Sequence, residues 1–233
     1  YERVDMPAQA EVDAFLPPFE PRQVLDTAEP VSIGAMVGPE AFMEVRYLAH
    51  AKQRQALELI PAWASVFKHI FGRESGGLTH TYKLEDAETV VVALGSVLGT
   101  IKDTVDEMRS RGVKIGVLGI TCFRPWPTAA VRSALAGAKH VVVLEKSLAV
   151  GLGGIVSNNV SASYPGSPDA VHTVIAGLGG RAITRGSLTK VFEQAIAGKL
   201  DPVTFLDLDY SIVDRVLARE REHRRSGPIA EAI

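Results

Sequence analysis

Five apolar segments recur between residues 89 and 208, and helix-like segments separate them. The apolar segments are TVVVAL (89–94), VKIGVLGI (113–120), HVVVLE (140–145), VHTVIAGL (171–178) and VTFLDL (203–208). Strands that are apolar at nearly every position are typical of a sheet covered on both faces. Their alternation with amphipathic helices predicts a parallel sheet, which right-handed crossovers make doubly wound. The sequence therefore predicts an α/β fold with a doubly wound, mostly parallel sheet.

The region before this sheet lacks the alternation. Six prolines fall within residues 1–40, and proline removes a backbone donor, so we expect an extended arm there. Residues 42–71 have helical periodicity, with a kink or a second helix start expected at Pro61 and an end at Gly72. Residues 75–88 are rich in glycine and polar residues, which is typical of a linker.

Three parts follow from this division. Residues 1–85 precede the α/β domain, residues 86–210 form it, and residues 211–233 are a charged tail. The charges of the tail predict a solvated helix or a frayed end. Since the chain begins with Tyr1 and not with Met, we expect it to be the back part of a longer polypeptide.

The bulk composition argues against several classes of protein. A net charge of −2 provides no positive field for nucleic acid. Apolar runs stay below the length of a membrane span and no signal peptide is recognisable, so we expect a cytoplasmic protein without a membrane partner. The single cysteine, Cys122, cannot by itself form a disulfide or hold an iron–sulfur cluster, and we expect it to pack as a strand-end thiol.

Two glycine clusters follow predicted strands, at Gly151–Gly154 and at Gly177–Arg181. Open α/β sheets place ligands or partners at the carboxyl ends of their strands. A P-loop needs a lysine and a hydroxyl residue after its last glycine, whereas Lys146 precedes the first cluster. This cluster is therefore either an anion-binding turn or a tight turn that lets a helix pack on a strand.

The stretch FRPWP (123–127) offers Arg124, which either binds a carboxylate or phosphate or bonds backbone carbonyls and shapes a turn. The sequence contains neither a metal-binding histidine spacing nor a hydrolase elbow, and the glycines after the first strand do not fit a dinucleotide fingerprint. We therefore predict no catalytic, cofactor-binding or metal-binding residue in this chain. The missing active site indicates a subunit whose chemistry is completed by another polypeptide chain.

Taken together, five stretches resemble the α subunit of the pyruvate:ferredoxin oxidoreductase family, whose members are thiamine-diphosphate-dependent 2-oxoacid oxidoreductases. The stretches are VSIGAMVGPEAFMEVRY (31–47), KLEDAETVVVALGSVLGT (83–100), FRPWP, VVVLEKSLAVGLGG (141–154) and AGLGGRAIT (176–184). The resemblance implies that residues 1–85 are the tail end of a pyrimidine-type thiamine domain. It implies that the following part is a transketolase C-terminal-like domain, which in this family chiefly makes subunit contacts.

The resemblance also implies an activity. The enzyme would decarboxylate pyruvate or a related 2-oxo acid oxidatively, pass electrons to ferredoxin or another acceptor, and transfer the acyl group to coenzyme A. Thiamine diphosphate with Mg and the iron–sulfur clusters would lie elsewhere in the complex, on β, γ and δ subunits or in the missing part of α. This segment would be mainly structural, with the interface candidates Arg124, Lys146, Gly151, Gly153, Gly154, Gly179 and Arg181.

Other functions stay open at this point. The substrate could be phenylglyoxylate, oxalate or a branched-chain 2-oxo acid, because substrate choice lies outside this segment. The chain could also be a non-catalytic assembly module that docks through its proline-rich arm, or a small nucleotide-binding regulator that uses the glycine-rich strand ends. Glu145 and Lys146 stand where many relatives of the family have an Asp-Arg pair.

Overall fold

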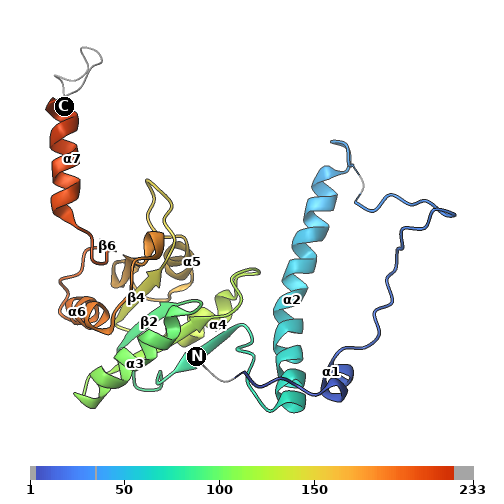
Figure 1. The fold of residues 1–233 in the computed structure, drawn as a ribbon, viewed down its shortest axis with the longest axis horizontal. Coiled ribbons are helices and arrows are strands. Elements are labelled where there is room, and N and C mark those ends of the chain that lie inside the picture. The colour runs from blue at the N-terminus through green and yellow to red at the C-terminus, as the bar shows by residue number, and fades with distance from the viewer. Residues whose placement is uncertain (1–3, 35, 223–233) are drawn as a thin grey trace.

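The computed structural model describes residues 4–34 and 36–222. Within these residues a six-stranded sheet has the order β1-β3-β2-β4-β5-β6, and helices flank it (Figure 1). The strands are β1 (Thr79–Tyr82), β2 (Thr89–Ala93), β3 (Ile115–Ile120), β4 (His140–Glu145), β5 (Val171–Ile175) and β6 (Val203–Phe205). The α-helices are α1 (Gln9–Phe15), α2 (Phe42–Phe71), α3 (Val97–Ser110), α4 (Thr128–Ala134), α5 (Val156–Ser163), α6 (Arg185–Ile196) and α7 (Tyr210–Glu222), and 3-10 turns cover Pro168–Ala170 and Leu178–Gly180.

Strands β2 to β6 run parallel, and apolar helix faces cover both sides of their sheet. On β2, Val91 faces the core formed with α3 and α6, whereas Val90 and Val92 face the core formed with α4 and α5. Such alternation buries every residue of the strand, which explains why its sequence is apolar throughout. The structure confirms the predicted doubly wound α/β fold.

The segment expected to be a linker contributes a strand. Residues Thr79–Tyr82 pair antiparallel with β3, in a register that places Thr79 opposite Ile120 and Tyr82 opposite Val117. The linker prediction for residues 75–88 was therefore wrong over these four positions. The domain boundary at residue 85 itself stays a prediction.

Helices α1 and α2 form a small unit beside the sheet domain (Figure 1). The ring of Phe15 on α1 makes edge contacts with Trp63, Phe67 and Phe71 on α2, at centroid distances of 5.4–5.7 Å. Helix α2 continues through Pro61, so the expected second helix start is absent from this described helix. Gly72 ends the helix in the left-handed conformation, at φ 66°, as predicted.

Two segments project away from the packed core. The described chain between α1 and α2 is extended and mostly exposed, in agreement with the predicted arm, whereas residues 9–15, also expected to be extended, form helix α1. Helix α7 extends from the far end of the sheet domain (Figure 1), and it covers the part of the predicted tail up to residue 222; residues 223–233 lie outside the described residues. Among the described helices, none combines the length and the apolar character that a bilayer span requires.

Candidate interface at the carboxyl edge of the sheet

The seven predicted interface residues follow β3, β4 and β5, so the structure places all of them beyond the carboxyl ends of parallel strands, at one edge of the sheet. Because β4 and β5 are neighbours, their two glycine-rich loops are adjacent. A Cβ added to Gly177 would lie 3.0 Å from Cε of Lys146, which shows how closely the loops approach. Arg124 follows β3, and β2 separates that strand from β4.

The turn from β4 to α5 is organised by the carboxylate of Glu145, which is only 3% exposed. Its Oε2 accepts hydrogen bonds from the backbone amides of Ile155 and Val156, both at 2.8 Å, and its Oε1 accepts one from the amide of Ser157 at 3.1 Å. The hydroxyl of Ser147 donates to Oε2 at 2.8 Å. These are the free amides with which a helix N-terminus binds an anion. The chain therefore fills this position with its own carboxylate.

Gly154 makes this arrangement possible by leaving space at the start of α5. A Cβ at position 154 would overlap Oε1 of Glu145 and Oγ of Ser157. Only a residue without a side chain allows the carboxylate to reach the helix amides. The geometry thus favours the packing-turn interpretation of the glycine cluster over the phosphate-loop interpretation.

The same turn holds two apolar side chains in solvent. Ala149 and Gly153 exchange backbone hydrogen bonds of 2.7 Å and 2.8 Å, which close the loop, and Gly151 takes a φ of 83° inside it. Val150 is 92% exposed and Leu152 is 69% exposed. A loop closed by its own hydrogen bonds presents such side chains at little further cost in conformational entropy on binding.

The loop after β5 is shaped by left-handed glycines and one arginine. Gly177 and Gly179 have φ values of 68° and 66°, and Gly180 has 84°. Nη1 of Arg181 donates a hydrogen bond to the carbonyl of Asp207, which ties this loop to the segment after β6. Arg181 therefore has an internal structural partner.

Arg124 also makes internal contacts. Its Nη1 donates to the carbonyl of Phe123 at 2.7 Å, and its guanidinium carbon lies 4.1 Å from the centroid of the Phe123 ring. The side chain is exposed, and this geometry favours the turn-shaping role over anion binding.

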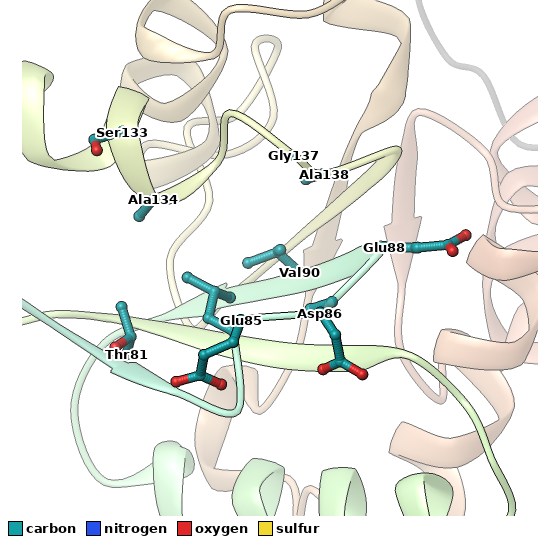
Figure 2. Close-up of a pocket in the computed structure, with 11 residues that line it drawn as sticks. Thr81, Glu85, Asp86, Glu88, Val90, Ser133, Ala134, Gly137 and Ala138 are labelled. Atoms are coloured by element: carbon teal, nitrogen blue, oxygen red, sulfur yellow. The ribbon is translucent and has the colours of Figure 1, made fainter.

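A pocket of about 530 Å³ opens near the amino ends of the strands, between the β1–β2 connection and the end of α4 (Figure 2). Figure 2 shows that the carboxylates of Glu85, Asp86 and Glu88 do not converge on one point. Asp86 pairs with Arg109, whose guanidinium holds the pKa of this carboxyl below its usual value.

Glu88 is neutralised in the same way. Its carboxylate binds Nζ of Lys139 at 2.7 Å and Nζ of Lys114 at 3.3 Å, and these ammonium groups lower its pKa, Lys139 most strongly. Across the described residues, no group of three histidine, cysteine or acidic side chains is placed to hold a metal ion. The ion pairs at this pocket therefore hold its surrounding loops in place.

Sequence reasoning identified Glu145 only as half of a charged pair, and its role as a helix cap was missed. A signal was present, because a carboxylate ends a buried strand eleven positions before the first residue of a helix, and glycines precede that helix. What the sequence could not supply was the fold of the loop that brings the two together.

Comparison with known proteins gives a consistent result. Residues 87–188 match the family model "Pyruvate:ferredoxin oxidoreductase core domain II". The pyruvate synthase subunit PorA of Methanosarcina barkeri is 41% identical over 199 residues, which cover 83% of this chain and 49% of that protein. The ketoisovalerate oxidoreductase subunit VorA of Pyrococcus horikoshii is 32% identical over 208 residues, covering 86% of this chain and 53% of that protein.

The chain thus spans about half the length of these curated relatives. Among solved structures, a 2-oxoglutarate:ferredoxin oxidoreductase from Magnetococcus marinus matches with a TM-score of 0.42 and 20% identity, over 58% of this chain and 24% of that one.

Proposed function

We propose that this chain is part of the α subunit of a 2-oxoacid:acceptor oxidoreductase. The premise is that residues 87–188 belong to the pyruvate:ferredoxin oxidoreductase family as its core domain II. The enzyme would decarboxylate pyruvate or a related 2-oxo acid oxidatively to an acyl-CoA and reduce ferredoxin. The observation that carries the proposal is the 41% identity to a pyruvate synthase subunit over 83% of the chain.

Within that enzyme we assign the segment a structural role at a subunit contact. The support is the carboxyl edge of the sheet, where the loop 149–153 holds Val150 and Leu152 in solvent while Glu145 occupies the neighbouring helix N-terminus. Exposed apolar side chains on a rigid loop are typical of contacts between chains. Arg181 and Arg124 already have internal partners, so they stabilise this edge in our proposal and do not bind a ligand.

Neither the cysteine nor the glycine-rich start of α5 fits a cofactor of such an enzyme. Sγ of Cys122 lies 3.4 Å from the carbonyl oxygen of Pro125. Because Cys122 is the single cysteine of the sequence, no second thiol is available to help hold an iron–sulfur cluster. The glycine-rich helix start that resembles a diphosphate site is filled by Glu145. Thiamine diphosphate, Mg and the clusters would therefore be bound elsewhere, on the β, γ and δ chains or on other parts of α. A cytoplasmic location stays a prediction.

The activity is tested on the native complex. We expect purification through this chain to yield several partner subunits, a brown iron–sulfur spectrum, and 2-oxoacid-dependent reduction of a ferredoxin or viologen dye in the presence of coenzyme A. A colourless, solitary chain without activity would favour the alternative of a non-catalytic assembly module.

The substrate is decided in the same assay. Pyruvate is the first candidate because a PorA subunit is the more similar relative, and a branched-chain 2-oxo acid is the second because the VorA subunit is 32% identical. The ratio of kcat/KM for pyruvate to that for 2-ketoisovalerate should exceed one if the first candidate is right.

The interface is tested by Val150→Asp and Leu152→Asp, with Ala136→Asp at an exposed position of the opposite edge as control. Both loop variants should keep the unfolding midpoint of the isolated chain, because the side chains are exposed, yet should recover less partner subunit than the control. Full assembly of both loop variants would show that this loop is not a contact.

A further inference from the structure

We propose that the cavity at the carboxyl ends of β2 and β3 binds a phosphate-bearing small molecule, a function separate from the proposed subunit contact. The cavity measures about 650 Å³ and is lined by residues that include Ser75, Gly76, His80, Gly95, Lys102 and Thr121. Its volume falls within the range of small-molecule sites, roughly 300–1,000 Å³. Carboxyl ends of strands are also where open α/β sheets bind ligands.

Lys102 supplies the cavity with a positive charge that forms no ion pair with a carboxylate of the described residues. Within residues 4–34 and 36–222 its ammonium group makes no ion pair, and it lies over the ring of Tyr82, with Nζ 5.3 Å from the centroid. The neighbouring acid, Asp106, is already bound to Nζ of Lys83 at 2.6 Å and to the hydroxyl of Tyr82 at 2.9 Å. An anion in the cavity would therefore meet an available ammonium group.

His80 and Thr121 add hydrogen-bonding groups on the other side of the cavity. Nδ1 of His80 lies 3.2 Å from Oγ1 of Thr121, and that hydroxyl also lies 3.3 Å from the carbonyl of Gly76. The hydroxyl donates to this carbonyl, so its oxygen accepts from Nδ1–H of His80, and Nε2 of the neutral ring is left as a hydrogen-bond acceptor. Nε2 can thus accept a hydrogen bond from a protonated phosphate oxygen.

Two glycines indicate that this arrangement requires space. A Cβ on Gly119 would overlap the His80 ring, and a Cβ on Gly76 would lie 2.6 Å from Oγ1 of Thr121. The β-sheet backbone at Gly119 and the turn at Gly76 therefore admit the imidazole and the hydroxyl where any other residue would displace them.

The remaining charges near the cavity agree with an anionic ligand. Glu74 also lines it, but its carboxylate is bound to Nζ of Lys68 at 2.5 Å. Helix α3 begins beside the cavity after Gly95 and has no acidic residue in its first turn, so its positive end is not neutralised by its own sequence. A cation, an imidazole nitrogen that accepts from a protonated phosphate oxygen, and a helix start together form a phosphate-binding set.

The test is calorimetric titration of the chain with inorganic pyrophosphate at constant ionic strength. We expect saturable binding that Lys102→Met weakens by about tenfold or more, because a hydrogen bond to a charged group is lost. Lys114→Met serves as the control, since that lysine pairs with Glu88 at the opposite edge, and its affinity should stay within about twofold of the original. Absence of binding, or equal binding in Lys102→Met, overturns the proposal.

A second readout does not depend on the stability of a variant. Pyrophosphate should shift the ring resonances of His80 in the NMR spectrum of the unmodified chain and leave those of His50, exposed on α2, unchanged. Equal shifts of both histidines would indicate a general salt effect and refute the site.

Discussion

Glu145 joins the end of β4 to the start of α5 through one buried carboxylate. Three backbone amides and one hydroxyl donate to it, so both oxygens accept hydrogen bonds within the turn. A charge that is buried and fully hydrogen-bonded is stabilising only as long as every partner remains in place. The residue therefore fixes the loop that we assign to a subunit contact.

Replacement of this carboxylate by an amide should destabilise the domain. Glu145→Gln directs an NH₂ group at backbone donors, and we expect the free energy of unfolding to fall by about 2 kcal/mol. Urea denaturation followed by circular dichroism measures the change. Glu107→Gln, at an exposed position of α3, should change the midpoint very little; equal effects of the two variants would contradict the role of Glu145.

Histidine titration should make the domain less stable in acid. Burial, with a smaller contribution from His140, lowers the pKa of His172 below 6.5, and Nδ1 of His172 has no hydrogen-bond partner among the described residues. The unfolded chain then binds more protons than the folded one, so the free energy of unfolding falls as the pH drops through about 6.5.

The measurement is the free energy of unfolding between pH 5.5 and 7.5. The slope against pH should become shallower in His172→Gln than in the original chain. Burial and then Lys102 lower the pKa of His80 in the same direction, so part of the slope should persist in this variant. An unchanged slope there would show that His172 does not titrate on unfolding.

At the scale of elements, two glycines near helix starts have opposite roles. Gly154 admits the Glu145 carboxylate, whereas a Cβ at Gly99, inside α3, would meet no atom within 4 Å. Gly154→Ala should destabilise the domain by about 1–3 kcal/mol through overlap, and Gly99→Ala should stabilise it by about 0.5–1 kcal/mol through helix propensity. Thermal unfolding of the two variants should shift in opposite directions; a shift in the same direction would refute the packing role of Gly154.

The elements that the sequence predicted well are those whose pattern is set by burial. Strand β4 occupies residues 140–145, where HVVVLE predicted it, because both sheet faces demand apolar residues. Strand β1 was missed because THTY lies at a sheet edge, where one half-exposed face tolerates polar residues. The Glu145 cap could not be predicted, since it depends on how the loop from residue 146 to 154 folds back.

On the scale of the whole molecule, packing density is uneven. The sheet domain has two buried cores on either side of one sheet, whereas the chain between α1 and α2 is exposed at most of its described residues and carries Phe19, Leu25 and Met36 in solvent. Exposed extended chain is the preferred substrate of proteases, because it enters their active sites without local unfolding.

Limited trypsin digestion should therefore cut after Arg22 before it cuts within residues 79–205. Mass spectrometry of timed samples would identify the first products. In the assembled complex this cut should slow if the arm lies on a partner chain, and should proceed at the same rate if it does not. Early cleavage between β2 and β5 would contradict the contrast between a tightly packed sheet domain and an exposed chain between α1 and α2.

The antiparallel edge strand β1 constrains the order in which parts of the chain can fold. Thr79 pairs with Ile120, and the whole of β2 and α3 lies between them in the sequence. During synthesis β1 emerges well before the strand on which it docks, and a loop of this length must close before the pairing forms. The connection between α2 and the sheet therefore becomes anchored only after β3 has left the ribosome. The α1–α2 unit is thus attached to the sheet late in folding.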